Sequence, residues 1–156
     1  MKNVILEKLE TIPFSIKYIE DVSEIHFQVH DGWSMKSLIS DIANTATQSF
    51  VAVYDERALA FCSYLVTDDA ELLFVCTHPS YRRMGIATKL ITDSLAMLPQ
   101  TLNSVVLEVR SRNRGALEFY KTLGFEKLGI RKDFYSTPKD DAIVMEKTRH
   151  GVKELN

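Results

Sequence analysis

The sequence has no long apolar run and little cysteine, and each of these absences excludes a class of protein. Only two of the 156 residues are cysteines, too few for the disulfide framework of a small secreted domain. Cys62 and Cys76 each lie inside an apolar run, so we expect two buried free thiols. No stretch approaches the length of a membrane span, and the first residues lack the apolar core of a signal peptide. We therefore expect a cytoplasmic protein that makes no contact with a membrane.

The sequence also has no excess of basic over acidic residues. The formal net charge at pH 7 is -2, whereas nucleic-acid-binding domains carry a basic patch or stripe, so we expect no direct nucleic-acid partner. No cysteine–histidine pair has the spacing of metal ligands, so we expect no metal. Linkers rich in glycine, proline or serine are absent too. The length suits one domain, which we expect over residues 1–148, followed by a flexible tail at residues 149–156.

The spacing of apolar residues predicts an alternation of strands and helices. Between the strands expected from residue 49 to residue 77, short breaks rich in acidic residues suit tight hairpins, so this part of the sheet should be antiparallel. The fold class is therefore α+β, with an inserted strand–helix–strand–helix unit. Strands are expected at residues 4–9, 49–54, 58–67, 71–77, 104–109, 125–134 and 142–147, and helices at residues 14–29, 34–43, 85–98 and 113–123.

A short turn from Arg82 to Ala87 precedes the clearest predicted helix. A helix start leaves backbone N–H groups unpaired and carries a partial positive charge, so it favours a phosphate. Gly85 lets the backbone approach such an anion closely, and Arg83 adds positive charge beside Arg82. The turn lacks the ending of a nucleotide P-loop and the glycine spacing of a Rossmann fold. By itself it is equally consistent with a helix start that carries a solvated arginine pair.

Three polar residues follow in the next predicted strand and helix. Alternation along the strand places Glu108 and Arg110 on the same face, so Glu108 is a carboxylate inside an apolar strand. Such carboxylates are seldom buried without a role, although an ion pair with Arg110 would also account for it. Asn113 is a good N-cap for the next helix. Tyr120 lies on the inner face of that helix, where tyrosines are usually core residues.

Together these residues resemble the GNAT superfamily of acetyltransferases. Its cofactor loop reads Gln/Arg-x-x-Gly-x-Gly/Ala, which Arg82, Gly85 and Ala87 match. The chain is most similar to one branch, the bacterial ribosomal-protein-alanine N-acetyltransferases. It departs from the family at Gly32, where proline is usual, and in the strand before the loop. The stretches similar to this branch are residues 107–110, 113, 120–125, 130–135 and 141–145.

The resemblance implies a central mixed, mostly antiparallel sheet of about seven strands with about four helices, split between strands four and five. It implies that acetyl-CoA is the co-substrate, that its pyrophosphate lies on the turn, and that strand four contacts it mainly through the backbone. The residues implied to bind acetyl-CoA are Val75, Cys76, Thr77, Arg82, Arg83, Met84, Gly85, Ile86, Ala87, Thr88 and Asn113.

The resemblance also implies direct attack of an amine on the thioester, without an acyl-enzyme. Glu108 would act as general base, through a water, and Tyr120 as general acid to the leaving thiolate. The implied acceptor is the N-terminal segment of a protein, an alanine-starting small-subunit ribosomal protein. An N-terminal amine has a pKa of about 8 and a lysine amine about 10.4, so the neutral α-amine costs about 3 kcal/mol less to form.

Two aromatic residues are candidates for binding that substrate. Tyr135 is expected in the loop between the last two strands, where it would contact the peptide or simply lie at the rim. Trp33 would lie in the substrate loop, although a hydrophobic staple with Leu38 explains it equally well. Two other functions stay open, namely acetylation of a small-molecule amine and acyl-CoA binding without catalysis.

Overall fold

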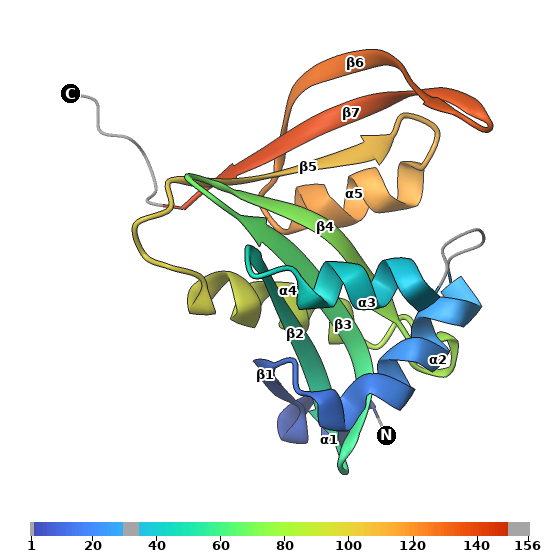
Figure 1. Ribbon diagram of the computed structural model, residues 1–156, viewed down its shortest axis with the longest axis vertical. Coiled ribbons are helices and arrows are strands. Elements are labelled where there is room, and N and C mark those ends of the chain that lie inside the picture. The colour runs from blue at the N-terminus through green and yellow to red at the C-terminus, as the bar shows by residue number, and fades with distance from the viewer. Residues whose placement is uncertain (1, 30–34, 150–156) are drawn as a thin grey trace. The chain divides into compact units, whose positions relative to one another are not determined.

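Seven strands and five α-helices form most of the chain in the computed structural model, which describes residues 2–29 and 35–149 (Figure 1). The strands are β1 (Glu10–Pro13), β2 (Thr47–Tyr54), β3 (Arg57–Val66), β4 (Ala70–Thr77), β5 (Ser104–Arg110), β6 (Glu126–Ser136) and β7 (Lys139–Thr148). The α-helices are α1 (Lys2–Lys8), α2 (Ile19–Val29), α3 (Met35–Ala43), α4 (Ile86–Met97) and α5 (Arg114–Thr122), and two short 3-10 helices are η1 (Ile16–Tyr18) and η2 (Pro79–Tyr81).

The strands form one mixed sheet in the order β1-β2-β3-β4-β5-β7-β6. The pairs β1–β2, β2–β3, β5–β7 and β6–β7 are antiparallel. β4 pairs parallel with β5 through Ala70 and Glu71, opposite Val105 and Val106. The predicted α+β class, the mostly antiparallel sheet and the split at strands four and five are confirmed. Among the described residues, no helix has the length and apolar character that crossing a membrane requires.

The first predicted strand is wrong, because α1 occupies this part of the chain. Ile5 and Leu9 are buried, with 2% and 4% of their surface exposed, whereas Glu7 between them is exposed. A strand that buried Ile5 and Leu9 would also bury Glu7, since alternate residues share a face, and a helix avoids this cost. The described part of the chain therefore contains five α-helices rather than about four.

The second predicted element, a helix over residues 14–29, begins later than expected. Ser15 caps η1 by accepting a hydrogen bond from the Lys17 N–H at 3.4 Å, and α2 starts at Ile19. Ile16 is 74% exposed, so it does not share the buried face of α2 with Val22. The bounds of α3, α4 and α5 agree with the predicted helices to within one residue.

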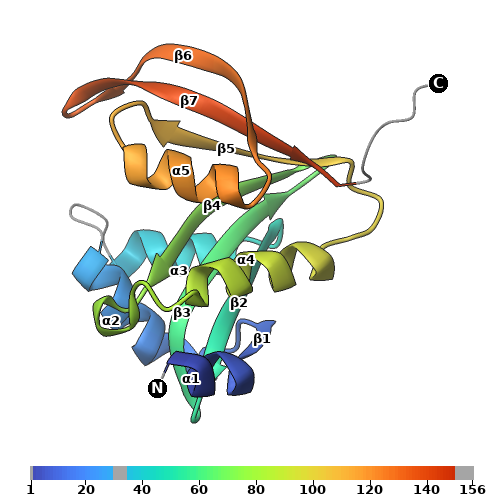
Figure 2. The ribbon, with the colours of Figure 1, turned by 180° about the vertical axis from the view of Figure 1, so that it is seen from behind.

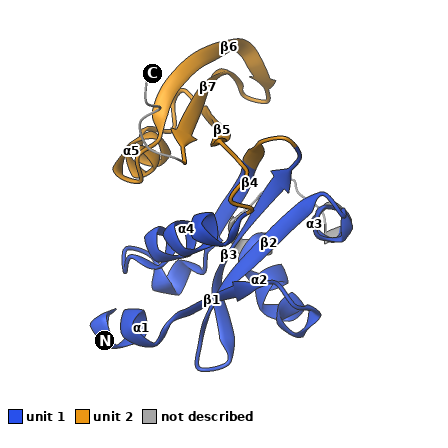
Figure 3. Ribbon diagram, turned by 90° about the vertical axis from the view of Figure 1, so that its left-hand side faces the viewer, with its two compact units in different colours: residues 1–67, 72–98 blue, residues 68–71, 99–156 orange. Residues whose placement is uncertain are grey.

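Contacts divide the chain into two compact units (Figure 3). Unit 1 comprises Met1–Thr67 and Leu72–Leu98, and unit 2 comprises Asp68–Glu71 and Pro99–Asn156. In unit 1, α2 and α3 cover one face of the strands while α4 covers the other (Figures 1 and 2). The single domain expected from the sequence stays a prediction. The core of unit 1 beneath α2 and α3 includes Val22, Ile25, Leu38, Val51, Phe61 and Phe74.

Unit 2 contains β5, β6, β7 and α5. Along β5 the side chains alternate as predicted: Leu107 and Val109 are buried, whereas Glu108 and Arg110 are partly exposed. The expected tail begins at Arg149, whose N–H donates to the Asn103 carbonyl at 2.8 Å. Residues 150–156 lie outside the described part of the chain.

Candidate active site

The predicted phosphate-binding turn leads directly into α4. Gly85 is the N-cap residue and has a left-handed backbone, with φ +85° and ψ 8°, a conformation that glycine adopts without steric cost. The Lys89 N–H makes the first helical hydrogen bond, to the Gly85 carbonyl at 3.1 Å. A glycine cap has no side chain to accept from the N–H groups of the first turn, so these donors can face an anion.

Around the turn, the first helical residue is buried, whereas the two arginines are exposed. Ile86 is buried, with 1% of its surface exposed, and anchors the start of α4 in the core of unit 1. Arg82, Arg83 and Thr88 are exposed. Val75 and Thr77, at the end of β4, are half-buried and belong to unit 1 as well. All the predicted cofactor-binding residues except Asn113 therefore lie in unit 1.

Both cysteines are free and buried, as predicted. Burial raises the pKa of both thiols, Cys62 and Cys76, to about 12. The thiolate is the reactive form of cysteine, so neither side chain is a nucleophile near neutral pH. Among residues 2–29 and 35–149, no group of three or more histidine, cysteine, aspartate or glutamate side chains could hold a metal ion.

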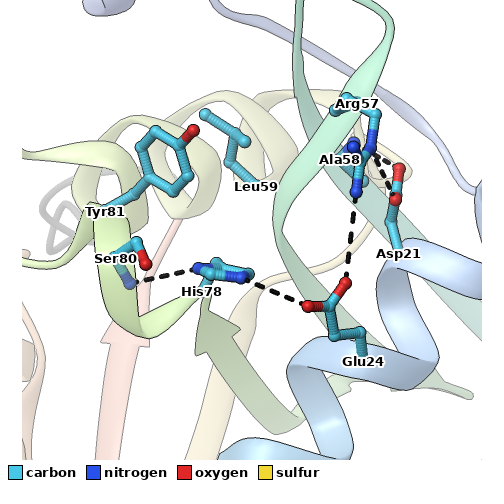
Figure 4. Close-up of a pocket in the computed structure, with 8 residues that line it drawn as sticks. All are labelled: Asp21, Glu24, Arg57, Ala58, Leu59, His78, Ser80 and Tyr81. Atoms are coloured by element: carbon cyan, nitrogen blue, oxygen red, sulfur yellow. Dashed lines mark hydrogen bonds and ion pairs between the residues drawn. The ribbon is translucent and has the colours of Figure 1, made fainter.

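A pocket that the sequence did not indicate lies between α2, the start of β3 and η2 (Figure 4). Arg57 Nε donates to Asp21 Oδ1 at 2.8 Å. His78 Nε2 lies 3.7 Å from Glu24 Oε1, and His78 Nδ1 accepts from the Ser80 N–H at 3.1 Å. The polar side chains of this pocket contact one another across α2, the start of β3 and the residue before η2. We interpret them as a network that fixes η2, which immediately precedes the predicted phosphate-binding turn.

Glu108 is paired with Arg131, a residue of the stretch 130–135 that resembles the branch, and this contact was not predicted from the sequence. Its Oε2 lies 3.0 Å from Nε of Arg131 on β6, and its side chain is 21% exposed. Glu108 therefore pairs with Arg131 and not with Arg110, the alternative partner considered from the sequence. Arg110 instead donates from Nη1 to the Pro138 carbonyl at 2.7 Å and from Nη2 to the Thr137 carbonyl at 3.2 Å, which ties β5 to the β6–β7 turn.

Tyr135 lies in β6, not in the loop where the sequence predicts it, because β6 extends to Ser136. The Arg110 guanidinium stacks on its ring, with Cζ 4.1 Å from the ring centroid. Burial raises the pKa of Tyr135, and the negative charge of Glu108 adds to the effect, so the phenol is neutral near pH 7. Trp33, the other predicted substrate residue, lies outside the described residues.

The remaining predicted residues lie on α5. Asn113 caps this helix as predicted, because its Oδ1 accepts from the Ala116 N–H at 3.0 Å. Tyr120 is 9% exposed, and its ring packs edge-on against Phe125 with centroids 5.8 Å apart. Unit 2 therefore contains Glu108, Tyr120, Asn113 and Tyr135. Their catalytic and binding roles stay predictions.

A second carboxylate, Glu71, lies close to Glu108 and was not predicted. It is half-buried on β4, opposite Val106 of β5. Burial raises the pKa of Glu71, the charge of Glu108 raises it further, and the charge of Arg131 lowers it. Periodicity could have placed Glu71 on the same face as Glu108 only if the register of β4 against β5 had been known.

A model of the acetyltransferase (GNAT) family matches residues 14–125, which is more than half of the chain. This chain belongs to the GNAT acetyltransferase family. It is an acetyl-CoA-dependent N-acetyltransferase, and the predicted family and enzyme class are confirmed.

Individual relatives agree with this family. The ribosomal protein bS18-alanine N-acetyltransferase of Escherichia coli (strain K12) is 28% identical over 116 residues, which cover 72% of this chain and 78% of that protein. The crystal structure of the ribosomal-protein-S18-alanine N-acetyltransferase from Escherichia coli has a TM-score of 0.81 at 23% identity, with coverage of 95% of this chain and 99% of that one. A GNAT family acetyltransferase from Elizabethkingia anophelis, solved with acetyl-CoA bound, has a TM-score of 0.76 at 14% identity, covering 92% and 99%. These similarities confirm the GNAT fold.

Proposed function

We propose that this GNAT enzyme transfers the acetyl group of acetyl-CoA directly to the α-amine of a protein N-terminus. The proposed substrate is a small-subunit ribosomal protein that starts with alanine, modified in the cytoplasm. The similarity to a bS18-alanine N-acetyltransferase supports this acceptor. The observation that carries the proposal is the half-buried carboxylate of Glu108 on β5, next to a second carboxylate, Glu71. Two carboxylates against one guanidinium favour a cationic acceptor such as an ammonium group.

The residues of the phosphate-binding turn fit acetyl-CoA. The glycine cap of α4 leaves first-turn N–H groups available for a pyrophosphate, and exposed Arg82 and Arg83 add two positive charges. The helix cap uses the carbonyl oxygen of Asn113, so its amide nitrogen can donate to the pantetheine arm. Acetyl-CoA supplies the activated acetyl thioester.

The proposed reaction is a direct transfer. The amine nitrogen bonds to the acetyl carbon, and the bond from that carbon to the CoA sulfur breaks. Glu108 accepts the proton that the amine loses, through a water, and Tyr120 gives a proton to the leaving thiolate. The high pKa values of the two buried thiols, about 12 each, disfavour an acyl-enzyme on cysteine.

This function is tested by measuring CoA release from acetyl-CoA with a panel of acceptors. The panel contains short peptides that differ only in the first residue, a polyamine as the small-molecule amine, and no acceptor. We expect release with the alanine-starting peptide and little with the polyamine. Release with the polyamine alone would favour the small-molecule function. Tight acetyl-CoA binding without release on any acceptor would favour acyl-CoA binding without catalysis.

A further inference from the structure

The ion pair between Glu108 and Arg131 joins two strands that are not neighbours. β7 lies between β5 and β6 in the sheet, so the Arg131 side chain has to cross β7 to reach Glu108. The contact distance is 3.0 Å from Nε to Oε2. The arginine side chain is 63% exposed and the glutamate side chain 21% exposed. A long exposed side chain therefore reaches across a strand to a more buried carboxylate.

The register of the three strands explains how this crossing is possible. Ala142 of β7 is directly opposite Arg110 of β5 on one side and Arg131 of β6 on the other. Directly opposite residues of antiparallel strands point to the same face of a sheet, so Arg131 shares the face of Arg110 and hence of Glu108. Glu108 itself is opposite Val144, so the arginine reaches diagonally across β7, past the single methyl group of Ala142.

A second contact holds the guanidinium in place. Cζ of Arg131 lies 5.6 Å from the ring centroid of Phe134, within the range of a cation–π interaction. The arginine is therefore fixed by an aromatic ring of its own strand as well as by Glu108. An exposed arginine held only by solvent would lose more rotamer entropy in forming the same ion pair.

Several charged and titratable groups surround Glu108, and Arg131 supplies the positive charge that pairs with it. Glu71 approaches from β4, and its pKa is raised first by burial and then by the charge of Glu108. Arg110 of β5 is occupied by the β6–β7 turn carbonyls and by the ring of Tyr135. Tyr135 of β6 is neutral, since burial and the charge of Glu108 raise its pKa. Arg131 is thus the basic side chain, among the described residues, that makes an ion pair with Glu108.

We propose that Arg131 is a positioning residue for the general base: it holds the Glu108 carboxylate in place and offsets the like charge of Glu71. This inference rests on the proposed function, in which Glu108 accepts the proton of the amine. Arg131 itself touches neither the amine nor acetyl-CoA in this role. It acts through Glu108, so its removal should change the pH dependence of the reaction more than the binding of acetyl-CoA.

The test replaces Arg131 with methionine and measures kcat/KM for the accepted peptide from pH 5.5 to pH 9. Loss of the guanidinium leaves two carboxylates close together, without the cation that offsets their like charge. We expect the acid limb of the profile to move up by about one pH unit, equivalent to a roughly ten-fold loss of kcat/KM on that limb. The KM for acetyl-CoA should stay within about two-fold, and Arg131→Lys, which keeps the charge, should restore part of the shift.

Two further variants separate this role from a structural one. Lys132→Met removes the same charge from the adjacent exposed residue of β6 and should leave the profile unchanged. Adding Glu71→Gln to Arg131→Met removes the competing carboxylate and should move the acid limb back. An active Arg131→Met enzyme with the profile of the wild type would overturn the proposal and leave the acetyltransferase function intact.

A readout independent of activity completes the test. Carbon-detected NMR titration follows the carboxyl group of Glu71 in the wild-type chain and in Arg131→Met. We expect Glu71 to titrate at higher pH in the variant, because the charge of Arg131 lowers its pKa in the wild type. An unchanged titration of Glu71 would overturn the proposal, and this outcome does not depend on whether the chain acetylates the peptide.

Discussion

Replacing Glu108 with glutamine is expected to lower kcat by about 10²- to 10⁴-fold, the usual contribution of general acid–base catalysis. Glutamine has nearly the same shape as glutamate but cannot accept a proton from the amine. The Kd for acetyl-CoA should change by less than about two-fold, because the residues proposed to hold the pyrophosphate lie on the turn before α4. Stopped-flow or steady-state CoA release gives kcat, and calorimetry gives the Kd.

The matched control for this substitution is Glu118→Gln. Glu118 lies on α5 in the same unit, its side chain is 73% exposed, and its nearest charged partner is Lys121 at 3.7 Å. The control loses the same charge at a site away from Glu108, so its kcat should equal that of the wild type. Full activity of Glu108→Gln from pH 6 to pH 9 would remove Glu108 from the role of general base.

Replacing Gly85 with alanine is expected to lower the free energy of unfolding by about 1–2 kcal/mol, the cost of a left-handed conformation for a residue with a Cβ. The φ of +85° causes this cost. The space around the residue does not, since an added Cβ would lie 3.5 Å from Leu6 Cδ1, an ordinary contact distance. Relief of the strain would rotate the amides of the turn, so acetyl-CoA affinity should fall about ten-fold or more.

Gly115→Ala provides the control for that substitution. Gly115 lies in α5, where an added Cβ would be 3.9 Å from Asn113 Oδ1. Alanine favours helices over glycine by up to about 1 kcal/mol, so this variant should be as stable as the wild type or more stable. Urea unfolding gives the stability of both variants, and calorimetry gives their affinity for acetyl-CoA. If Gly85→Ala bound acetyl-CoA as tightly as the wild type, the turn would not be the pyrophosphate site.

Local patterns predict most of the elements because burial on one face leaves a regular spacing in the sequence. α4 and β5 show this well, since their buried residues follow the helical and strand periods. α1 was missed because seven residues with mixed spacing fit either element. The decisive fact there is that Glu7 stays exposed, which depends on the packing of the folded chain.

Some of the site residues could likewise be predicted from local sequence patterns, and others could not. Glu108, Gly85 and Asn113 could be singled out because each has a local signal, namely a carboxylate in an apolar strand, a glycine at a helix start and an N-cap. Glu71 has no such signal, and Arg131 belongs to a stretch that resembles the branch, residues 130–135, without any local sign that it contacts Glu108. Their proximity to Glu108 depends on the register of β4, β5, β7 and β6, which residues distant in sequence determine together.

The central claim, direct acetylation of a protein N-terminus, is tested most directly by locating the acetyl group on a peptide with two kinds of amine. A peptide that begins with alanine and contains an internal lysine is incubated with the full chain and acetyl-CoA, and tandem mass spectrometry locates the acetyl group. We expect the acetyl group on the alanine α-amine, the lysine unmodified, and one CoA released per peptide. Acetylation of the lysine alone, or CoA release without an acetylated peptide, would contradict the claim.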